Sequence, residues 1–260
     1  MQIDFGRTAQ DYGRYRAEFP PALFDRLFTF GIGIAGQQVL DLGTGTGTLA
    51  RGFALRGCNI TGLDPSTSLT EEAKRLDHEA GVSVRYVTAK AEQTGLPDTS
   101  FDVVTAGQCW HWFDRPKAAQ EVRRLLIPQG WLVIAHFDWI PLPDNVVDAT
   151  EKLIEQHNSE WKMSGGRGMY SRWLRDVAIA GFHEIETFSF DTFVPYTHEA
   201  WRGRIRASAG VAASLPADRV ARFDADLQKL LQKRFPDDPL AVHHRVFVVV
   251  CRSLKAKAGD

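Results

Sequence analysis

The sequence predicts an α/β fold built on a doubly wound, mostly parallel sheet. Short apolar stretches with strand character alternate with amphipathic helical stretches between about residues 38 and 138. The strand expected at 38–42 runs directly into a glycine turn and then a helix, which places a ligand-binding turn at the carboxyl edge of the sheet. The chain has 260 residues, 44% of them hydrophobic, which is enough for a core of this size.

Local patterns predict the elements in order. Leu23, Phe24 and Leu27 recur at helical spacing, so the segment before the first strand is expected to be a helical lead-in. Gly57 and Gly81 are expected to end two of the helices that follow. We expect helices at 47–56, 66–80 and 116–126, and strands at 59–64, 82–87, 101–106 and 131–137.

The alternation changes after residue 138, where Pro141 and Pro143 interrupt the chain. Helices are expected at 145–161, at 170–180 and over much of 198–234, and strands at 184–193 and 246–251. This pattern predicts three parts: a helical lead-in at 1–35, a core at 36–194 and 236–254, and a helical insertion at 195–235 that covers the ligand edge of the sheet as a substrate cap.

Composition narrows the class of function. The formal net charge is −1, which gives no overall field for nucleic acid or an anionic membrane. No stretch has the length of a membrane span or the form of a signal peptide, and the three cysteines lack zinc-ligand spacing, so we expect a cytoplasmic protein with free thiols. Because His243 and His244 are adjacent on an expected strand, their side chains point to opposite faces, and no metal site is predicted.

The glycine turn at Gly43, Gly45 and Gly47 admits two classes of ligand. The dinucleotide fingerprint Gly-x-Gly-x-x-Gly needs a glycine where Thr48 stands. Asp41 precedes the turn, where a carboxylate is unfavourable beside a pyrophosphate but suits an ammonium group. An acid at the end of the second strand, Asp64, can accept hydrogen bonds from both ribose hydroxyls. Adenosine joined to a methionine satisfies both conditions.

Four motifs carry a resemblance to a known family. The stretches 39–47, 62–66, 91–102 and 106–114 resemble, in order and spacing, the motifs of class I S-adenosylmethionine-dependent methyltransferases, in the type 11 group that acts on small molecules. The chain departs from that pattern at Lys90, where many relatives carry an aspartate that contacts adenine, and at Ala17, where a proline is common.

The resemblance implies a Rossmann-like sheet that is mostly parallel, with a final antiparallel strand and a helical insertion. It implies S-adenosyl-L-methionine as cofactor, S-adenosyl-L-homocysteine as its product, a small-molecule methyl acceptor, and a monomer or homodimer. It also implies a set of cofactor- and acceptor-binding positions. Asp41, Gly43 and Gly45 would hold the methionine portion, Asp64 the ribose, Ser66, Ala91 and Glu92 the adenine side, and Gln108 the sulfonium, while Trp110 and Trp112 would shape the acceptor side.

Methyl transfer needs a base only when the acceptor atom carries a proton. His111 is the preferred candidate, because its ordinary pKa lies near neutral pH. A purely structural role, such as a hydrogen bond to nearby backbone, is the alternative; His136 and Asp138 are further candidates.

Two other groups are candidates for acceptor contacts. Tyr12 and Tyr15, in the lead-in, are expected to lie near the ligand. Arg202 and Arg206 share a helix face and could clamp a carboxylate or phosphate; the alternative is a solvated basic face.

Two other functions stay open at this point. The first is a methyltransferase acting on RNA, DNA or protein, against which stand the near-neutral charge and the absence of an Asn/Asp-Pro-Pro-Tyr type motif after the fourth strand. The second is a non-catalytic regulatory protein that binds S-adenosylmethionine.

Overall fold

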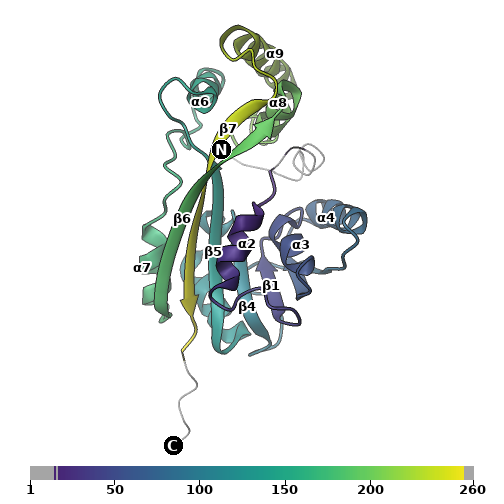
Figure 1. Ribbon diagram of the computed structural model, residues 1–260, viewed down its shortest axis with the longest axis vertical. Helices are drawn as coiled ribbons and strands as arrows, with labels where there is room; N and C mark the ends of the chain where they lie inside the picture. Colours follow the sequence, from purple (N-terminus) through teal and green to yellow (C-terminus); the bar gives the residue numbers. More distant parts are fainter. Residues whose placement is uncertain (1–14, 16, 255–260) are drawn as a thin grey trace, which may run out of the picture. The chain divides into compact units, whose positions relative to one another are not determined.

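The computed structural model describes Tyr15 and residues 17–254, and it contains one sheet of seven strands in the order β3-β2-β1-β4-β5-β7-β6 (Figure 1). The sheet is mostly parallel, and β7 is the antiparallel strand, which confirms the predicted fold class. The strands are β1 (Gln38–Leu42), β2 (Asn59–Leu63), β3 (Arg85–Val87), β4 (Phe101–Gly107), β5 (Leu126–Trp139), β6 (His183–Tyr196) and β7 (Leu240–Arg252).

Strand β1 lies between β2 and β4, and both neighbours run parallel to it. The register pairs Asp41 with Gly62 on one side and with Thr105 on the other. Parallel strands in this register end at one common edge, where their connections leave the sheet. The turn after β1 and the segments after β2 and β4 therefore meet at the carboxyl edge, as the sequence predicted.

Helices alternate with the strands along the chain. Their bounds are α2 (Pro21–Phe28), α3 (Thr48–Ala54), α4 (Thr67–Glu79), η2 (Trp110–Trp112, a 3₁₀ turn), α5 (Arg115–Leu125), α6 (Val146–His157), α7 (Arg172–Ile179), α8 (His198–Arg206) and α9 (Ala217–Arg234). Most begin and end within a few residues of the predicted positions, because the apolar periodicity and the stop signals that define them are local.

The chain forms two compact units. The first, here called the sheet unit, contains residues 18–137, 170–189 and 246–254 of the described chain. In its core, Leu40 and Leu42 pack in one apolar cluster with Val122 of α5 and Val177 of α7. Because strand side chains alternate between faces, the intervening Asp41 points to the opposite face of the sheet.

The second unit, here called the helical unit, contains Tyr15, Ala17 and residues 138–169 and 190–245. Its core joins α6, α8 and α9 through side chains such as Ile154, Trp201 and Phe223, all with little or no exposed surface. Residues 138–169, which the sequence analysis kept with the core, thus pack with the helices of the expected insertion. Helices α8 and α9 do lie between β6 and β7 in the chain, and their role as a substrate cap stays a prediction.

The three strands β5, β6 and β7 are longer than predicted. The sequence indicated 131–137, 184–193 and 246–251, whereas the strands span Leu126–Trp139, His183–Tyr196 and Leu240–Arg252. At the start of β7 the additional residues alternate between buried and more exposed positions, so they lack the continuous apolar run on which the prediction depended. Among the described residues, no helix is both long enough and apolar enough to cross a membrane.

Candidate functional site

The three glycines of the turn have different local surroundings. Gly43, Gly45 and Gly47 all have left-handed backbone, with φ of +59°, +57° and +78°. A Cβ on Gly43 would lie 2.9 Å from the sulfur of Cys109, and one on Gly47 would lie 2.6 Å from the hydroxyl of Tyr86. A Cβ on Gly45 would meet nothing within 4 Å. Gly43 and Gly47 are therefore required for packing, and Gly45 is the glycine that leaves open space beside the turn.

Asp41 lies beneath this turn and is almost completely buried. One carboxylate oxygen accepts a hydrogen bond from Thr44 Oγ1 at 2.7 Å, and the other accepts one from Thr105 Oγ1 at 2.6 Å. Burial raises the pKa of Asp41 to about 6, although both hydroxyl contacts act to lower it. The two threonines are partners that the sequence analysis missed. The predicted contact of Asp41 with an ammonium group stays a prediction.

Asp64 follows β2 and reaches the same turn. Its carboxylate accepts hydrogen bonds from the backbone N–H of Gly45 at 2.9 Å and of Ser66 at 2.8 Å. Ser66 in turn caps helix α4, since its hydroxyl accepts from the N–H of Leu69. Burial raises the pKa of Asp64, and the two backbone contacts oppose that effect. The carboxylate is thus held rigidly beside the open space at Gly45.

A buried ionic network that the sequence analysis did not identify holds the turn from below. Arg51 of α3 donates to Asp77 of α4 at 2.8 Å and to the carbonyl of Thr46 at 3.0 Å. Tyr86 donates to the other oxygen of Asp77 at 2.7 Å. Both charged side chains are about 5% exposed. Arg51 also pairs with the exposed Glu18 at 3.3 Å. Removal of Arg51 would leave the Asp77 carboxylate buried without a charged partner, so this network fixes the turn to the helices that follow it.

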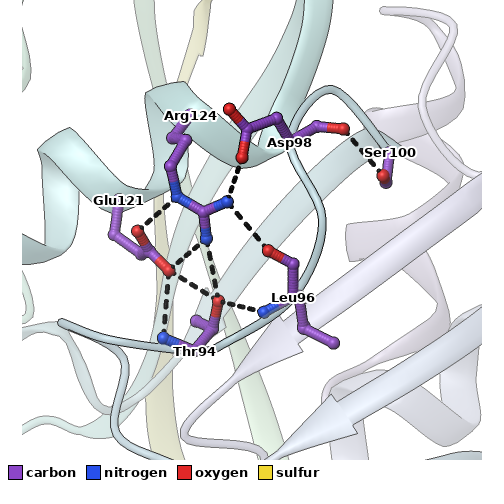
Figure 2. Close-up of polar contacts among 6 residues, drawn as sticks. All are labelled: Thr94, Leu96, Asp98, Ser100, Glu121 and Arg124. Atoms are coloured by element: carbon purple, nitrogen blue, oxygen red, sulfur yellow. Dashed lines mark hydrogen bonds and ion pairs between the residues drawn. The ribbon is translucent and has the colours of Figure 1, made fainter.

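The loop that follows β3 contains the predicted adenine-side residues Ala91 and Glu92. Ala91 is buried in the core of the sheet unit, and the Glu92 carboxylate accepts the N–H of Asp114 at 2.8 Å. Further along the loop, Arg124 donates to the carbonyl of Leu96 at 2.8 Å, and Glu121 accepts from both the N–H and the hydroxyl of Thr94, at 3.0 and 2.6 Å (Figure 2).

The pair Arg124 and Glu121 therefore fixes this loop to α5. Two of its hydrogen bonds join the pair itself, at 2.8 and 2.6 Å, and Asp98 adds a further contact to Arg124 (Figure 2). The hydrogen bonds from Arg124 lower the pKa of Glu121 to about 2. The two residues are one helical turn apart, but the sequence did not indicate which loop they hold.

The segment after β4 packs against the glycine turn at Gly43. Gln108 has a left-handed backbone with φ of +61°, which is uncommon outside glycine, and its N–H donates to the carbonyl of Ala135 at 2.8 Å. The next side chain, Cys109, contacts the carbonyl of Leu42. Trp110, predicted to line the acceptor side, is fully buried in the core against Phe113, whereas Trp112 is 45% exposed. The position of Trp110 fits a core role better than an acceptor contact.

His111 and His136 form a pair in the sheet unit. The Nδ1 atom of His111, on η2, lies 3.2 Å from Nε2 of His136, near the end of β5. His136 is buried, with its ring beside the stacked rings of Tyr170 and Trp173. The sequence analysis named both histidines but not their contact. The signal was available, because parallel β4 and β5 place Gly107 beside Ala135, so both residues follow at the same edge.

The predicted acceptor residues of the helical unit have intramolecular partners. Arg202 and Arg206 both pair with Asp224 of α9, and both also pair with Glu199. Tyr15 packs so closely on Gly203 that a Cβ there would lie 2.3 Å from its ring. Tyr12 lies outside the described residues. The anion clamp at Arg202 and Arg206 stays a prediction, and Asp224 already supplies the anion that these two guanidinium groups would need.

Within the described part of the chain, no group of three or more His, Cys, Asp or Glu side chains is arranged to bind a metal ion. His243 pairs with Asp191 at 2.9 Å, whereas the neighbouring His244 is buried and contacts the carbonyl of Val242 at 3.0 Å. The two histidines thus have separate surroundings, as expected for adjacent residues on a strand.

Comparison with known proteins gives one family. Residues 40–134 match the family described as "Methyltransferase domain". The chain is 33% identical to the uncharacterized methyltransferase YcgJ of Bacillus subtilis, over 71% of this chain and 68% of that protein. It is 34% identical to the uncharacterized methyltransferase Rv3342 of Mycobacterium tuberculosis, and the match spans 51% of this chain and 51% of that relative, so the chain spans about half the length of that curated protein.

Solved structures share the fold. The crystal structure of YcgJ superposes with a TM-score of 0.57 at 21% identity, over 89% of this chain and 98% of that one. Phosphoethanolamine N-methyltransferase 2 of Haemonchus contortus, in complex with S-adenosyl-L-methionine, gives a TM-score of 0.55 at 20% identity, over 96% of this chain and 57% of that one. At these identities the likeness concerns the fold alone.

Proposed function

The chain belongs to the methyltransferase family, and on this premise we propose that it transfers a methyl group from S-adenosyl-L-methionine to a small-molecule acceptor. The observation that carries the cofactor assignment is the pairing of Gly45 with Asp64. Gly45 leaves open space at the carboxyl edge of the sheet, and the Asp64 carboxylate is fixed beside it by the Gly45 N–H. A carboxylate so held can accept hydrogen bonds from the two hydroxyls of a ribose.

Other residues of the sheet unit also suit S-adenosylmethionine as the cofactor. Asp41 offers a buried negative charge beneath the turn, which suits the ammonium group at the amino-acid end of the cofactor. Ala91 and Glu92 belong to a loop that Arg124 and Glu121 hold in place, which supports a fixed adenine pocket. When bound, S-adenosylmethionine would supply a methyl group already activated by a sulfonium. The remaining task of the protein is to orient the acceptor, exclude water and, for a protonated acceptor, remove a proton.

We assign proton removal to His111, positioned by His136. The contact between them admits two tautomers, because either ring nitrogen can donate. When His111 donates its Nδ1 proton to His136, its Nε2 is unprotonated and can accept a proton from an acceptor hydroxyl or amine. The rings of Tyr170 and Trp173 fix the orientation of His136 and thereby support this arrangement.

A small-molecule acceptor is supported by the near-neutral charge and by relatives whose names state their acceptors. One, the malonyl-[acyl-carrier protein] O-methyltransferase of Pectobacterium atrosepticum, is 33% identical over half of this chain and half of its own length. The described cysteines, Cys58, Cys109 and Cys251, are buried free thiols, which supports our assignment to a reducing compartment such as the cytoplasm.

Ligand-dependent melting tests the cofactor assignment. S-adenosylmethionine and S-adenosylhomocysteine should each raise the melting temperature, and NAD should not. Asp64→Ala should abolish most of the shift, because the fixed carboxylate is lost. Asp25→Ala is the matched control, since that carboxylate is 75% exposed in the same unit. Stabilisation by NAD alone, or a full shift in Asp64→Ala, would refute the assignment.

Turnover needs its own measurement. Incubation with methyl-labelled S-adenosylmethionine and a panel of small acids, phenols, amines and quinone precursors should transfer label to at least one acceptor. Binding of the cofactor without transfer to these acceptors, to RNA or to protein would instead favour a non-catalytic regulatory protein.

A further inference from the structure

The segment that follows β3 begins beside the carboxylate assigned to the ribose. Strand β3 pairs in parallel with β2, and Val87 lies opposite Leu63. The backbone N–H of Asp64 then donates to the carbonyl of Val87 at 3.2 Å, so the two segments leave the sheet side by side. Residues 88–93 therefore start at the same edge of the sheet as Asp64, on the side away from β1.

The order of the strands matches the order of the parts of the proposed cofactor. In S-adenosylmethionine the ribose joins the amino-acid part to the base. The residues assigned to the amino-acid part, Asp41 and Gly45, belong to β1 and its turn, and the carboxylate assigned to the ribose follows β2. Because β3 lies next to β2 on the far side from β1, the base is expected beside the segment that follows β3. Recognition of the base then depends on the polar groups of that segment.

The segment forms a tight turn with a lysine on its outer side. The carbonyl of Lys90 accepts a hydrogen bond from the backbone N–H of Gln93 at 3.1 Å, which closes the turn. The flanking Ala89 and Ala91 pack against the core of the sheet unit, whereas Lys90 is exposed. The turn therefore holds Lys90 at a fixed position on the surface, next to the place where the base is expected.

The carboxylate of the same turn has partners within the protein. One oxygen of Glu92 accepts the backbone N–H of Asp114 at 2.8 Å, and Lys117 interacts with Glu92 electrostatically. These contacts direct Glu92 towards the start of α5. Among the residues that the structure describes, no carboxylate forms an ion pair with Lys90. Lys90 is thus the charged group that this turn offers to a ligand.

We propose that Lys90 determines which purine base the cofactor site accepts, and that the site does not select for the amino group of adenine. An ammonium group only donates hydrogen bonds, and the amino group at position six of adenine also donates. A 6-oxopurine has an oxygen at that position, which can accept a hydrogen bond from Lys90. A hypoxanthine base therefore suits this site at least as well as adenine. This inference rests on the proposed function, because it takes the base to be part of the bound cofactor.

Calorimetry with two forms of the product tests the inference without turnover. The probes are S-adenosyl-L-homocysteine and its 6-oxo analogue, S-inosyl-L-homocysteine. In the wild type the analogue should bind more tightly than S-adenosylhomocysteine, or equally to within about threefold. A preference for S-adenosylhomocysteine greater than this would show that the amino group is selected, and it would overturn the proposal.

Two substitutions test whether Lys90 is responsible. Lys90→Asp replaces a donor by an acceptor, so S-adenosylhomocysteine should become the preferred ligand by about tenfold or more. Lys90→Met removes the donor and keeps an unbranched stem, and it should weaken binding of the 6-oxo analogue more than binding of S-adenosylhomocysteine. Lys74→Asp, at an exposed lysine of α4 in the same unit, is the matched control and should keep the wild-type ratio of the two affinities. A ratio in both Lys90 variants equal to that in the control would overturn the proposal.

The affinity of the wild type for S-adenosylhomocysteine distinguishes this proposal from the proposed function. Failure of the wild type to bind either product would refute the cofactor assignment, and this inference with it. Binding of S-adenosylhomocysteine together with rejection of the 6-oxo analogue would refute only the role of Lys90.

Discussion

The Nδ1 atom of His111 lies 3.2 Å from Nε2 of His136, although the two residues are 25 positions apart in the chain. The contact exists because β4 and β5 are parallel neighbours that end at one edge of the sheet. It joins a partly exposed histidine to a buried one whose ring plane is set by Tyr170 and Trp173. Such a pair can hold one imidazole in a defined tautomer, which a single histidine in a loop cannot do.

Substitution of each histidine should separate proton transfer from positioning. With a hydroxyl or amine acceptor, His111→Gln should lower kcat about 100-fold or more, because the base is lost. His136→Phe should lower kcat less and change its pH profile, because His111 remains but its tautomer is no longer fixed. Both variants should bind S-adenosylhomocysteine as the wild type does. Unchanged kcat in His111→Gln would show that the base lies elsewhere.

Alanine at Gly45 should mainly weaken cofactor binding, whereas alanine at Gly47 should mainly destabilise the fold. Gly45→Ala should cost only about 1 kcal/mol of folding free energy, from its left-handed backbone, yet weaken cofactor binding strongly, because the new methyl enters the open space. Gly47→Ala should destabilise the fold more, since its Cβ would lie 2.6 Å from the Tyr86 hydroxyl that Asp77 holds. Chemical denaturation and calorimetry measure the two quantities, and full cofactor affinity in Gly45→Ala would contradict the assignment of the open space.

Asp41 should make the fold more stable in mild acid. Its pKa is about 6 in the folded protein against an ordinary value of 3.8, so the folded protein binds more protons than the unfolded chain between these values. The free energy of unfolding from this residue should therefore rise as the pH falls from 7 through 6 towards 4. Asp41→Asn should remove much of this dependence in urea titrations, and the exposed Asp25→Asn should not. An identical pH dependence in Asp41→Asn and wild type would contradict this.

Glu121 should act with the opposite sign at lower pH. Its pKa is lowered from 4.5 to about 2, so its contribution to stability is complete above pH 4.5 and is lost as the pH falls towards 2. Glu121→Gln should reduce the melting temperature at pH 7. It should also make the melting temperature fall less steeply as the pH drops from 4.5 to 2. The exposed Glu79→Gln is the control in the same unit. A melting temperature in Glu121→Gln equal to that of the control would show that the loop does not depend on this pair.

The sequence by itself determined the features that depend on neighbours along the chain. The strand, glycine turn and helix from Gln38 to Ala54 follow from local apolar runs and from backbone angles that favour glycine. The position of Asp64 at a strand end follows from the same reasoning, because parallel strands in this fold class end at one edge. Those local rules also predicted the sheet that the structure confirms.

Only the tertiary structure decided which side chains meet. The sequence identified Arg202 and Arg206 as a pair for a ligand, but both pair with Asp224 of a helix some 20 residues further on. It identified His111 and His136 separately, and it did not identify the buried pair of Arg51 and Asp77. The physical reason is that charge pairing and tautomer choice depend on partners brought together by packing, which local residue spacing does not specify.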